Sequence, residues 1–215
     1  MDDAERTRFI EQQTRLESPM LVPEIRLHAA SELTPLWTAT QSTLDLSDLE
    51  PPFWAFAWPG GQALARYVLD HSELVVGARV FDFAAGSGIV AIAAAKSGAA
   101  CVTACDIDPL ASVAARLNAN ASGVDIDVVS RDPVGEPLAS VDVVLAGDVF
   151  YDRAAAARFD PWFRALAAAG RVVIVGDPGR AYLPPDLARV ADYHVPVAFE
   201  VESTKSMRTT IWRYP

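Results

Sequence analysis

Short apolar runs alternate with amphipathic segments along most of the chain. Residues 100–104, 126–129, 141–146 and 171–176 are mostly apolar, as in strands buried on both faces, and another apolar strand begins at residue 80. Apolar residues recur at helical spacing in the segments that we expect to be helices: 2–16, 62–69, 89–97, 109–120, 154–169 and 183–191. Alternating polar and apolar residues predict a short strand at 24–28 and a C-terminal β-hairpin from 193–201 and 209–213.

This order of elements predicts an α/β fold. Strands that alternate with helices form a parallel sheet covered by helices on both faces. Two consecutive strands at the end of the chain, with no helix between them, require an antiparallel edge. Residues 1–50 hold too few large apolar side chains for a core of their own, so we expect an N-terminal arm or lid beside one domain over residues 51–215.

Small residues connect the strand that begins at residue 80 to the helix at 89–97. Gly86 and Gly88 have no Cβ, so a ligand can approach the backbone at this helix N-terminus. Asp106 follows the glycines by about 20 residues, the offset at which an acid reaches ribose hydroxyls in nucleotide-binding βαβ units. The pattern therefore predicts a nucleoside cofactor. Asp82 would repel a pyrophosphate and suits a positively charged cofactor such as S-adenosylmethionine.

Polar residues follow the later strands at the same edge of the predicted sheet, where ligands of parallel sheets bind. Asp132 follows the strand at 126–129, and Asp148 and Tyr151 follow the strand at 141–146. Asp148 and Tyr151 can face one pocket around a turn; in the alternative, Asp148 caps the next helix. Residues 177–180 belong either to this rim or to a plain turn.

Residues 51–61 combine prolines, glycines and aromatic residues. This composition disfavours a regular element and predicts a shaped loop. Aromatic side chains on a rigid loop serve as binding anchors or as core packing. Trp58 therefore either lines a ligand site or packs in the core.

Composition and charge argue against several classes of function. A net charge of −10 disfavours nucleic acid as a partner and favours basic ones, including a lysine-bearing protein surface. The charged N-terminus is no signal peptide, and the longest apolar run, residues 89–95, is too short to span a bilayer, so we expect a cytoplasmic protein without a membrane partner. Cys101 and Cys105 are expected to be reduced thiols in the core, and two Cys with three scattered His do not favour a metal site.

The motifs at the strand ends resemble those of the seven-β-strand methyltransferases that use S-adenosylmethionine. The Asp-x-x-Tyr pattern of Asp148 and Tyr151 is similar to that of a protein-lysine methyltransferase group among them. Residues 53–64, with 23–28 and 35–37 in support, further resemble the electron transfer flavoprotein β-subunit lysine methyltransferases and their bacterial relatives. The resemblance spans residues 20–214 and implies a Rossmann-like seven-stranded sheet, mostly parallel, with a C-terminal antiparallel hairpin.

The resemblance also implies residue roles. Asp148 and Tyr151 would be the catalytic residues that build the pocket for a substrate lysine. Ala84 stands where the family usually has glycine; a positive φ there would cost alanine about 1 kcal/mol, and we expect an ordinary backbone instead. S-adenosylmethionine, with S-adenosylhomocysteine as its product, would contact Trp58, Asp82, Ala84, Gly86, Gly88, Asp106, Ile107, Arg131 and Asp132.

The function implied by the resemblance is methylation of lysines in the electron transfer flavoprotein β subunit by a monomeric enzyme. One alternative is a methyltransferase for a ribosomal protein or a small molecule. An NAD(P)-linked oxidoreductase is opposed by Asp82 and by the terminal hairpin. An inactive cofactor-binding scaffold is the alternative from outside the enzymes.

Overall fold

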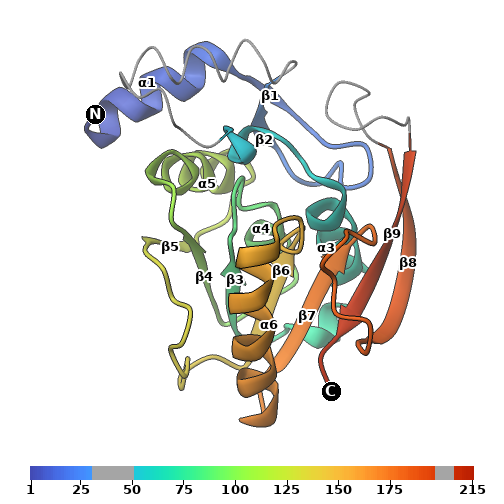
Figure 1. Ribbon diagram of the computed structural model, residues 1–215. Coiled ribbons are helices and arrows are strands. Elements are labelled where there is room, and N and C mark those ends of the chain that lie inside the picture. The colour runs from blue at the N-terminus through green and yellow to red at the C-terminus, as the bar shows by residue number, and fades with distance from the viewer. Residues whose placement is uncertain (31–50, 197–205) are drawn as a thin grey trace.

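The computed structural model describes residues 1–30, 51–196 and 206–215, and within them a seven-stranded sheet organises the molecule (Figure 1). Its strand order is β5-β4-β3-β6-β7-β9-β8. Neighbouring strands from β5 to β7 are parallel, and β9 is antiparallel to both β7 and β8. The predicted α/β class and the antiparallel hairpin edge are thereby confirmed. The bounds are β3 (Arg79–Phe83), β4 (Cys101–Asp106), β5 (Asp127–Ser130), β6 (Val143–Gly147), β7 (Val172–Asp177), β8 (Ala188–Pro196) and β9 (Ser206–Arg213).

Helices cover both faces of this sheet. In Figure 1, α6 crosses in front of the strands and α4 lies behind them. The helices are α1 (Asp3–Gln13), α3 (Pro59–Asp70), α4 (Ile89–Lys96), α5 (Pro109–Ala121) and α6 (Arg153–Ala168), with short 3-10 turns η1 (Phe53–Ala55) and η2 (Ser72–Leu74). Two further strands, β1 (Arg15–Glu17) and β2 (Leu27–Ala29), pair with each other outside the main sheet.

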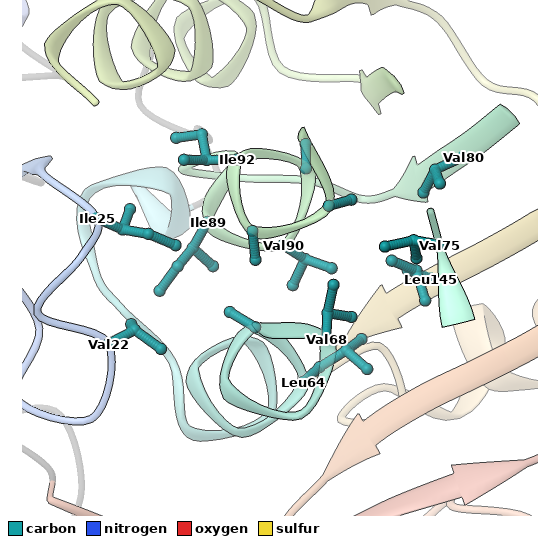
Figure 2. Close-up of a cluster of buried hydrophobic side chains, with 14 of the residues drawn as sticks. Val22, Ile25, Leu64, Val68, Val75, Val80, Ile89, Val90, Ile92 and Leu145 are labelled. Carbon is teal, nitrogen blue, oxygen red and sulfur yellow. The ribbon is translucent and has the colours of Figure 1, made fainter. Parts of the chain in front are cut away.

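The core behind the sheet is packed by aliphatic side chains from helices and strands. Leu64 and Val68 on one side of α3 lie against α4 and the sheet, with Leu145 of β6 nearby (Figure 2). Val80 of β3 and Ile174 of β7 belong to the same buried cluster. Residues 80–83 of β3 are all buried, with Val80 in this cluster and Phe81 and Phe83 in the cluster on the other face, as expected for a strand covered on both faces.

The core on the α6 side is aromatic. The Phe83 ring, at the end of β3, lies edge-on to the rings of Phe159, Trp162 and Phe163 of α6, with centroids 4.9, 5.1 and 5.5 Å away. Each such aromatic pair contributes about 0.5–1.5 kcal/mol beyond its buried area. This packing fixes the carboxyl end of β3, where the predicted cofactor site begins.

The first 30 residues are fastened to α5. Phe9 and Ile10 of α1 are buried against apolar residues of α5. The backbone N–H of His28 donates to the side chain of Asn118 (2.7 Å), and that of Arg26 donates to Ser122 Oγ (3.0 Å). The resemblance residues 35–37 lie outside the described residues, so a lid function for residues 1–50 stays a prediction.

Three expectations about the elements are wrong. The predicted helix at 183–191 is a turn followed by β8, because Pro184 and Pro185 lack the N–H donors that a helix interior needs. Helix α3 begins at Pro59 rather than at residue 62, since proline fits the first helical position. Cys105 is a buried free thiol as predicted, whereas Cys101 is free but exposed where β4 begins. The predicted strand at 193–201 extends beyond residue 196 into residues outside the described part.

Candidate active site

The turn between β3 and α4 has three residues in the left-handed backbone region. Ala84 has φ 52°, Gly86 has φ 50° and Gly88 has φ 75°. The expectation of an ordinary backbone at Ala84 is therefore wrong. The turn needs positive φ there, and alanine adopts it at a cost of about 1 kcal/mol or more. Ala84 is exposed at the rim of the sheet, where the resemblance places the cofactor.

Asp82 lies beneath this turn rather than on its surface. Its side chain is 1% exposed and accepts a hydrogen bond from the backbone N–H of Ala91 (2.9 Å) in the first turn of α4. The pKa of Asp82 is raised to about 8, mainly by burial and also by the nearby Asp106, while the Ala91 hydrogen bond opposes the shift. Asp82 thus stabilises the start of α4 and places an ionisable group under the glycines.

Asp106 organises the rim at the end of β4. One carboxylate oxygen accepts the N–H of Gly86 (2.8 Å) and the other accepts the N–H of Asp108 (2.9 Å). Burial raises its pKa, and these hydrogen bonds oppose the shift. The carboxylate remains partly exposed, and the side chain of Ile107 beside it is 72% exposed. The predicted spacing therefore does bring Asp106 to the glycine turn.

Arg131 and Asp132 follow β5 at the outer part of the rim. The N–H of Arg131 donates to the carbonyl of Asp106 (3.1 Å), which joins this corner to the end of β4. Both side chains are exposed and engaged in ion pairs, Arg131 with Glu136 and Asp132 with Arg158 of α6.

An aromatic cluster, formed by Phe53, Phe56, Trp58 and Tyr151, lies beside this rim. The indole N–H of Trp58 donates to the carbonyl of Phe53 (2.8 Å), which fixes the ring. The Phe53 ring lies 5.7 Å from Trp58 and 5.6 Å from Tyr151, and Phe56 lies 6.0 Å from Trp58. The half-buried Trp58 and the exposed Tyr151 both contact Phe53, and Trp58 also packs against a buried cluster that includes Trp54 and Phe56. A ligand-lining role for Trp58 stays a prediction.

Helix α3 meets the ends of β6 and β7 through glycines. A Cβ on Gly60 would lie 2.2 Å from the Gly176 carbonyl oxygen and 2.5 Å from Asp148 Oδ2. A Cβ on Gly147 would lie 2.8 Å from the backbone of Gly61. Side chains are excluded at these positions, so the N-terminus of α3 is held directly against the carboxyl ends of both strands. The Pro-Gly-Gly sequence at residues 59–61 therefore allows α3 to pack closely on the sheet, and it also ends the aromatic segment.

Asp148 is positioned by that contact. It is 9% exposed, has φ 56°, and its Oδ2 accepts the N–H of Gly61 (2.9 Å) in the first turn of α3. The alternative that Asp148 caps the following helix is wrong, because Asp152 caps α6 through the N–H of Ala155 (2.8 Å). Asp148 caps α3 instead, a helix far away in the sequence.

The charge of Asp148 is set by burial and by one arginine. The pKa of Asp148 is raised to about 6, mainly by burial and also by Asp177 at the end of β7. Arg180 and the Gly61 N–H act against it. These donors therefore favour the charged form of Asp148 and hold its pKa below the value that burial alone would give.

Arg180 is the site residue that sequence reasoning left as part of a possible turn. Its Nη2 and Nε lie 3.0 and 3.3 Å from Asp148 Oδ1, and its Cζ lies 6.0 Å from the centre of the Trp58 ring. The turn that presents it is built by Asp177, whose Oδ1 accepts the N–H groups of Gly179 and Arg180, each at 2.7 Å. The sequence signal that could have identified Arg180 is the Asp-x-Gly-Arg pattern of residues 177–180 at the end of a strand.

The predicted residues thus form two groups on one rim. Gly86, Gly88, Asp106 and Ile107 lie at the ends of β3 and β4, while Asp148, Tyr151 and Trp58 gather at β6 and the start of α3. Among the described residues, no group of three or more His, Cys, Asp and Glu side chains is placed to hold a metal ion. In the same part of the chain, no helix is long and apolar enough to cross a membrane.

Comparisons with known proteins agree with this arrangement. A putative RNA methyltransferase from Pyrococcus horikoshii, 17% identical, superposes with a TM-score of 0.59 over 78% of this chain and 89% of its own. The family model for ribosomal protein L11 methyltransferase (PrmA) matches residues 62–148, from α3 to Asp148. The fold is that of the Rossmann-like methyltransferases, as the resemblance implied.

Longer matches define the family. The electron transfer flavoprotein beta subunit lysine methyltransferase of Danio rerio is 36% identical over 206 residues, 93% of this chain and 79% of the relative. The Homo sapiens protein of the same name is 34% identical over 220 residues, 99% of this chain and 83% of the relative. The chain is a methyltransferase, and it belongs to the family of electron transfer flavoprotein beta subunit lysine methyltransferases.

Proposed function

We propose that this chain transfers a methyl group from S-adenosylmethionine to lysine side chains of an electron transfer flavoprotein β subunit. The observation that carries the proposal is Asp148, an almost buried carboxylate held at the N-terminus of α3 beside the aromatic cluster. Relatives named for this activity match over almost the whole chain. An acid in an aromatic surrounding suits a long, cationic side chain with an apolar stem.

The residues at β3 and β4 fit a cationic nucleoside cofactor. Each carboxylate oxygen of Asp106 accepts one backbone N–H and keeps a lone pair for a ribose hydroxyl. Ile107 offers an exposed apolar surface for a base. Asp82 beneath the turn and Asp106 on the rim form no ion pair within the described residues. A positive charge on the ligand would therefore stabilise the ionised form of both acids. Trp58, Ala84, Arg131 and Asp132 complete the proposed contacts.

The substrate side of the site holds and desolvates a lysine. When bound, S-adenosylmethionine supplies a methyl group on a sulfonium, and sulfur keeps the electron pair as the lysine nitrogen forms its bond to that carbon. Asp148 orients the amine, while Tyr151 and Trp58 exclude water from around it. Since a free lysine has a pKa of about 10.4, the ammonium must lose a proton to water or to Asp148 before it can react.

A ribosomal protein is the second candidate substrate. The match to the L11 methyltransferase model favours it, but that match ends at residue 148. It covers the cofactor half of the rim and leaves out Tyr151, Arg180 and the β8–β9 hairpin. The matches to the electron transfer flavoprotein group include these segments, and they favour the flavoprotein substrate.

Methylation assays with both candidate substrates test the proposal. Purified protein is incubated with labelled S-adenosylmethionine and either electron transfer flavoprotein or ribosomal protein L11, and each product is examined by mass spectrometry. We expect added methyl groups on lysines of the flavoprotein β subunit and none on L11. Methylation of L11 alone would overturn the substrate, and absence of S-adenosylmethionine binding by calorimetry would overturn the cofactor.

A further inference from the structure

We propose that Arg180 is a positioning residue whose guanidinium neutralises Asp148, so that this acid holds the substrate lysine as a neutral amine. The inference rests on the proposed function and adds to it a residue that determines the protonation of the substrate. It answers a physical difficulty of the site. A lone carboxylate beside the lysine would stabilise the ammonium, which has no lone pair with which to react.

The geometry of Asp148 leaves room for one more donor. Oδ1 accepts both Nη2 and Nε of Arg180, which uses its two lone pairs, whereas within the described residues Oδ2 accepts only the Gly61 N–H. The second lone pair of Oδ2 can accept one N–H of an incoming amine. The carboxylate thus orients the amine through a hydrogen bond while its charge is already balanced by the arginine.

The surrounding groups set the sign of the effect. The described charged groups that act on Asp148 are Arg180 from the β7–β8 turn and Asp177 at the end of β7, and α3 adds the positive end of its dipole. Asp177 alone would favour the ammonium. Arg180 and the helix N-terminus oppose it, and Arg180 is the only full positive charge in this described set.

Arg180 is also held in a fixed place, as a positioning role requires. Its backbone N–H donates to Asp177 Oδ1 (2.7 Å), and its guanidinium lies against the face of Trp58. Burial of most of its side chain, which is 21% exposed, weakens screening by water. Arg180 is therefore held beside Asp148 and does not have to move during each turnover.

Removing the charge shifts the pH dependence in one direction. Without Arg180, the pKa of Asp148 rises, and so does the pKa of a lysine bound beside it. Either change means that the productive state, carboxylate with neutral amine, needs a higher pH. For Arg180→Gln we therefore expect the acid limb of the kcat/KM profile to move up by about one pH unit, with an approximately tenfold loss at neutral pH that is recovered at higher pH.

Two variants separate this role from others. Arg180→Lys keeps the charge and is expected to keep the acid limb within about 0.3 pH unit of wild type. Arg79→Gln breaks an exposed Arg–Asp pair at the opposite end of the sheet, with Asp142, and serves as the matched control without a shift. A purely structural Arg180 would lower kcat equally at all pH values, and an arginine that blocks the pocket would give a lower KM in Arg180→Gln.

The experiment measures pH profiles of flavoprotein methylation for wild type and these variants, with S-adenosylmethionine affinity from calorimetry. The expected upward shift in Arg180→Gln, with unchanged cofactor affinity and rescue by Arg180→Lys, supports the inference. An unshifted acid limb in an active Arg180→Gln variant overturns it and leaves the proposed function intact. A wild type that binds S-adenosylmethionine but methylates no flavoprotein lysine overturns the proposed substrate, and the inference falls with it.

Discussion

The two halves of the rim are assembled in different ways. At β3 and β4, the contacts of the site are local: Asp82 bonds to Ala91, nine residues away, and Asp106 bonds to Gly86, 20 residues away. At β6 and β7, Asp148 bonds to Gly61, 87 residues away, and to Arg180, 32 residues away. A single βαβ unit can build the first half, whereas the second exists only when α3 is packed on the sheet.

The halves also differ in how they treat negative charge. Asp82 is buried and Asp106 is half-buried, and neither forms an ion pair within the described residues. Asp148 is paired with Arg180. Unbalanced acids suit a ligand that brings a permanent positive charge, as a sulfonium does. A balanced acid suits a ligand that must give up its charge before it reacts. The half at β3 and β4 therefore suits the binding of a cation, whereas the half at β6 and β7 suits the removal of a proton from the substrate.

Substitution of Asp148 should affect chemistry far more than cofactor binding. In Asp148→Asn, the side chain keeps its shape but loses the charge that pairs with Arg180 and orients the amine. We expect flavoprotein methylation to fall by about 100-fold or more, with S-adenosylmethionine affinity within about twofold by calorimetry. Asp152→Asn is the matched control, because Asp152 only caps α6 and asparagine is an equally good cap. Near-native turnover in Asp148→Asn would remove this residue from the proposed role.

The neighbouring glycines Gly60 and Gly61 test the packing that builds the second half. In Gly60→Ala, the new Cβ would meet backbone oxygen 2.2 Å away, so α3 must move from β7 and release Asp148. We expect a loss of about 2 kcal/mol in the free energy of unfolding, measured in urea, together with weaker methylation. In Gly61→Ala, the Cβ meets only the Ile89 side chain at 3.3 Å, so the effect should be much smaller. Equal stability losses in the two variants would contradict this packing.

The sequence predicted the local half of the site because its signals lie within one stretch. The glycine turn, Asp106 and the strand–helix alternation all follow from spacing within residues 80–106, and the structure has them in place. The prediction was wrong at Ala84, where the family's usual glycine was the available sign of positive φ and the turn geometry overrides the preference of alanine.

The distant half could be predicted only in part. The resemblance indicated Asp148 and Tyr151. No sequence pattern predicts that Gly60 packs on Gly176 or that Arg180 bonds to Asp148. Such contacts depend on how α3 crosses the sheet, which propensity and periodicity do not specify. The helix predicted at 183–191 was wrong for a simpler reason, because its apolar spacing was given more weight than Pro184 and Pro185.

The buried acids in the two halves should give different pH windows of stability. Because the folded-state pKa of Asp82 is raised to about 8, its folded state keeps a proton that the unfolded chain loses near pH 4. Its contribution to stability is therefore present at low pH and is lost as pH rises to about 8. For Asp148, with a pKa of about 6, the corresponding loss ends about two pH units earlier.

Asparagine variants separate these windows. Relative to wild type, Asp82→Asn should gain about 1 kcal/mol in the free energy of unfolding for each pH unit between pH 5 and pH 8, measured by urea unfolding at each pH. Asp148→Asn should gain little above pH 7. If the wild-type and Asp82→Asn curves stay parallel from pH 5 to pH 8, Asp82 is not protonated in the folded protein.

The smallest effect is expected at Ala84, where the local half carries backbone strain. Glycine removes the left-handed penalty of about 1–2 kcal/mol but adds unfolded-state entropy worth about 0.5–1 kcal/mol. We expect Ala84→Gly to be more stable by about 0.5 kcal/mol in thermal or urea unfolding, with cofactor affinity within about twofold. Ala85→Gly is the matched control, because Ala85 is not among the positive-φ residues, and glycine there should destabilise the fold. A loss of stability in both variants would mean that the turn holds alanine at position 84 without strain.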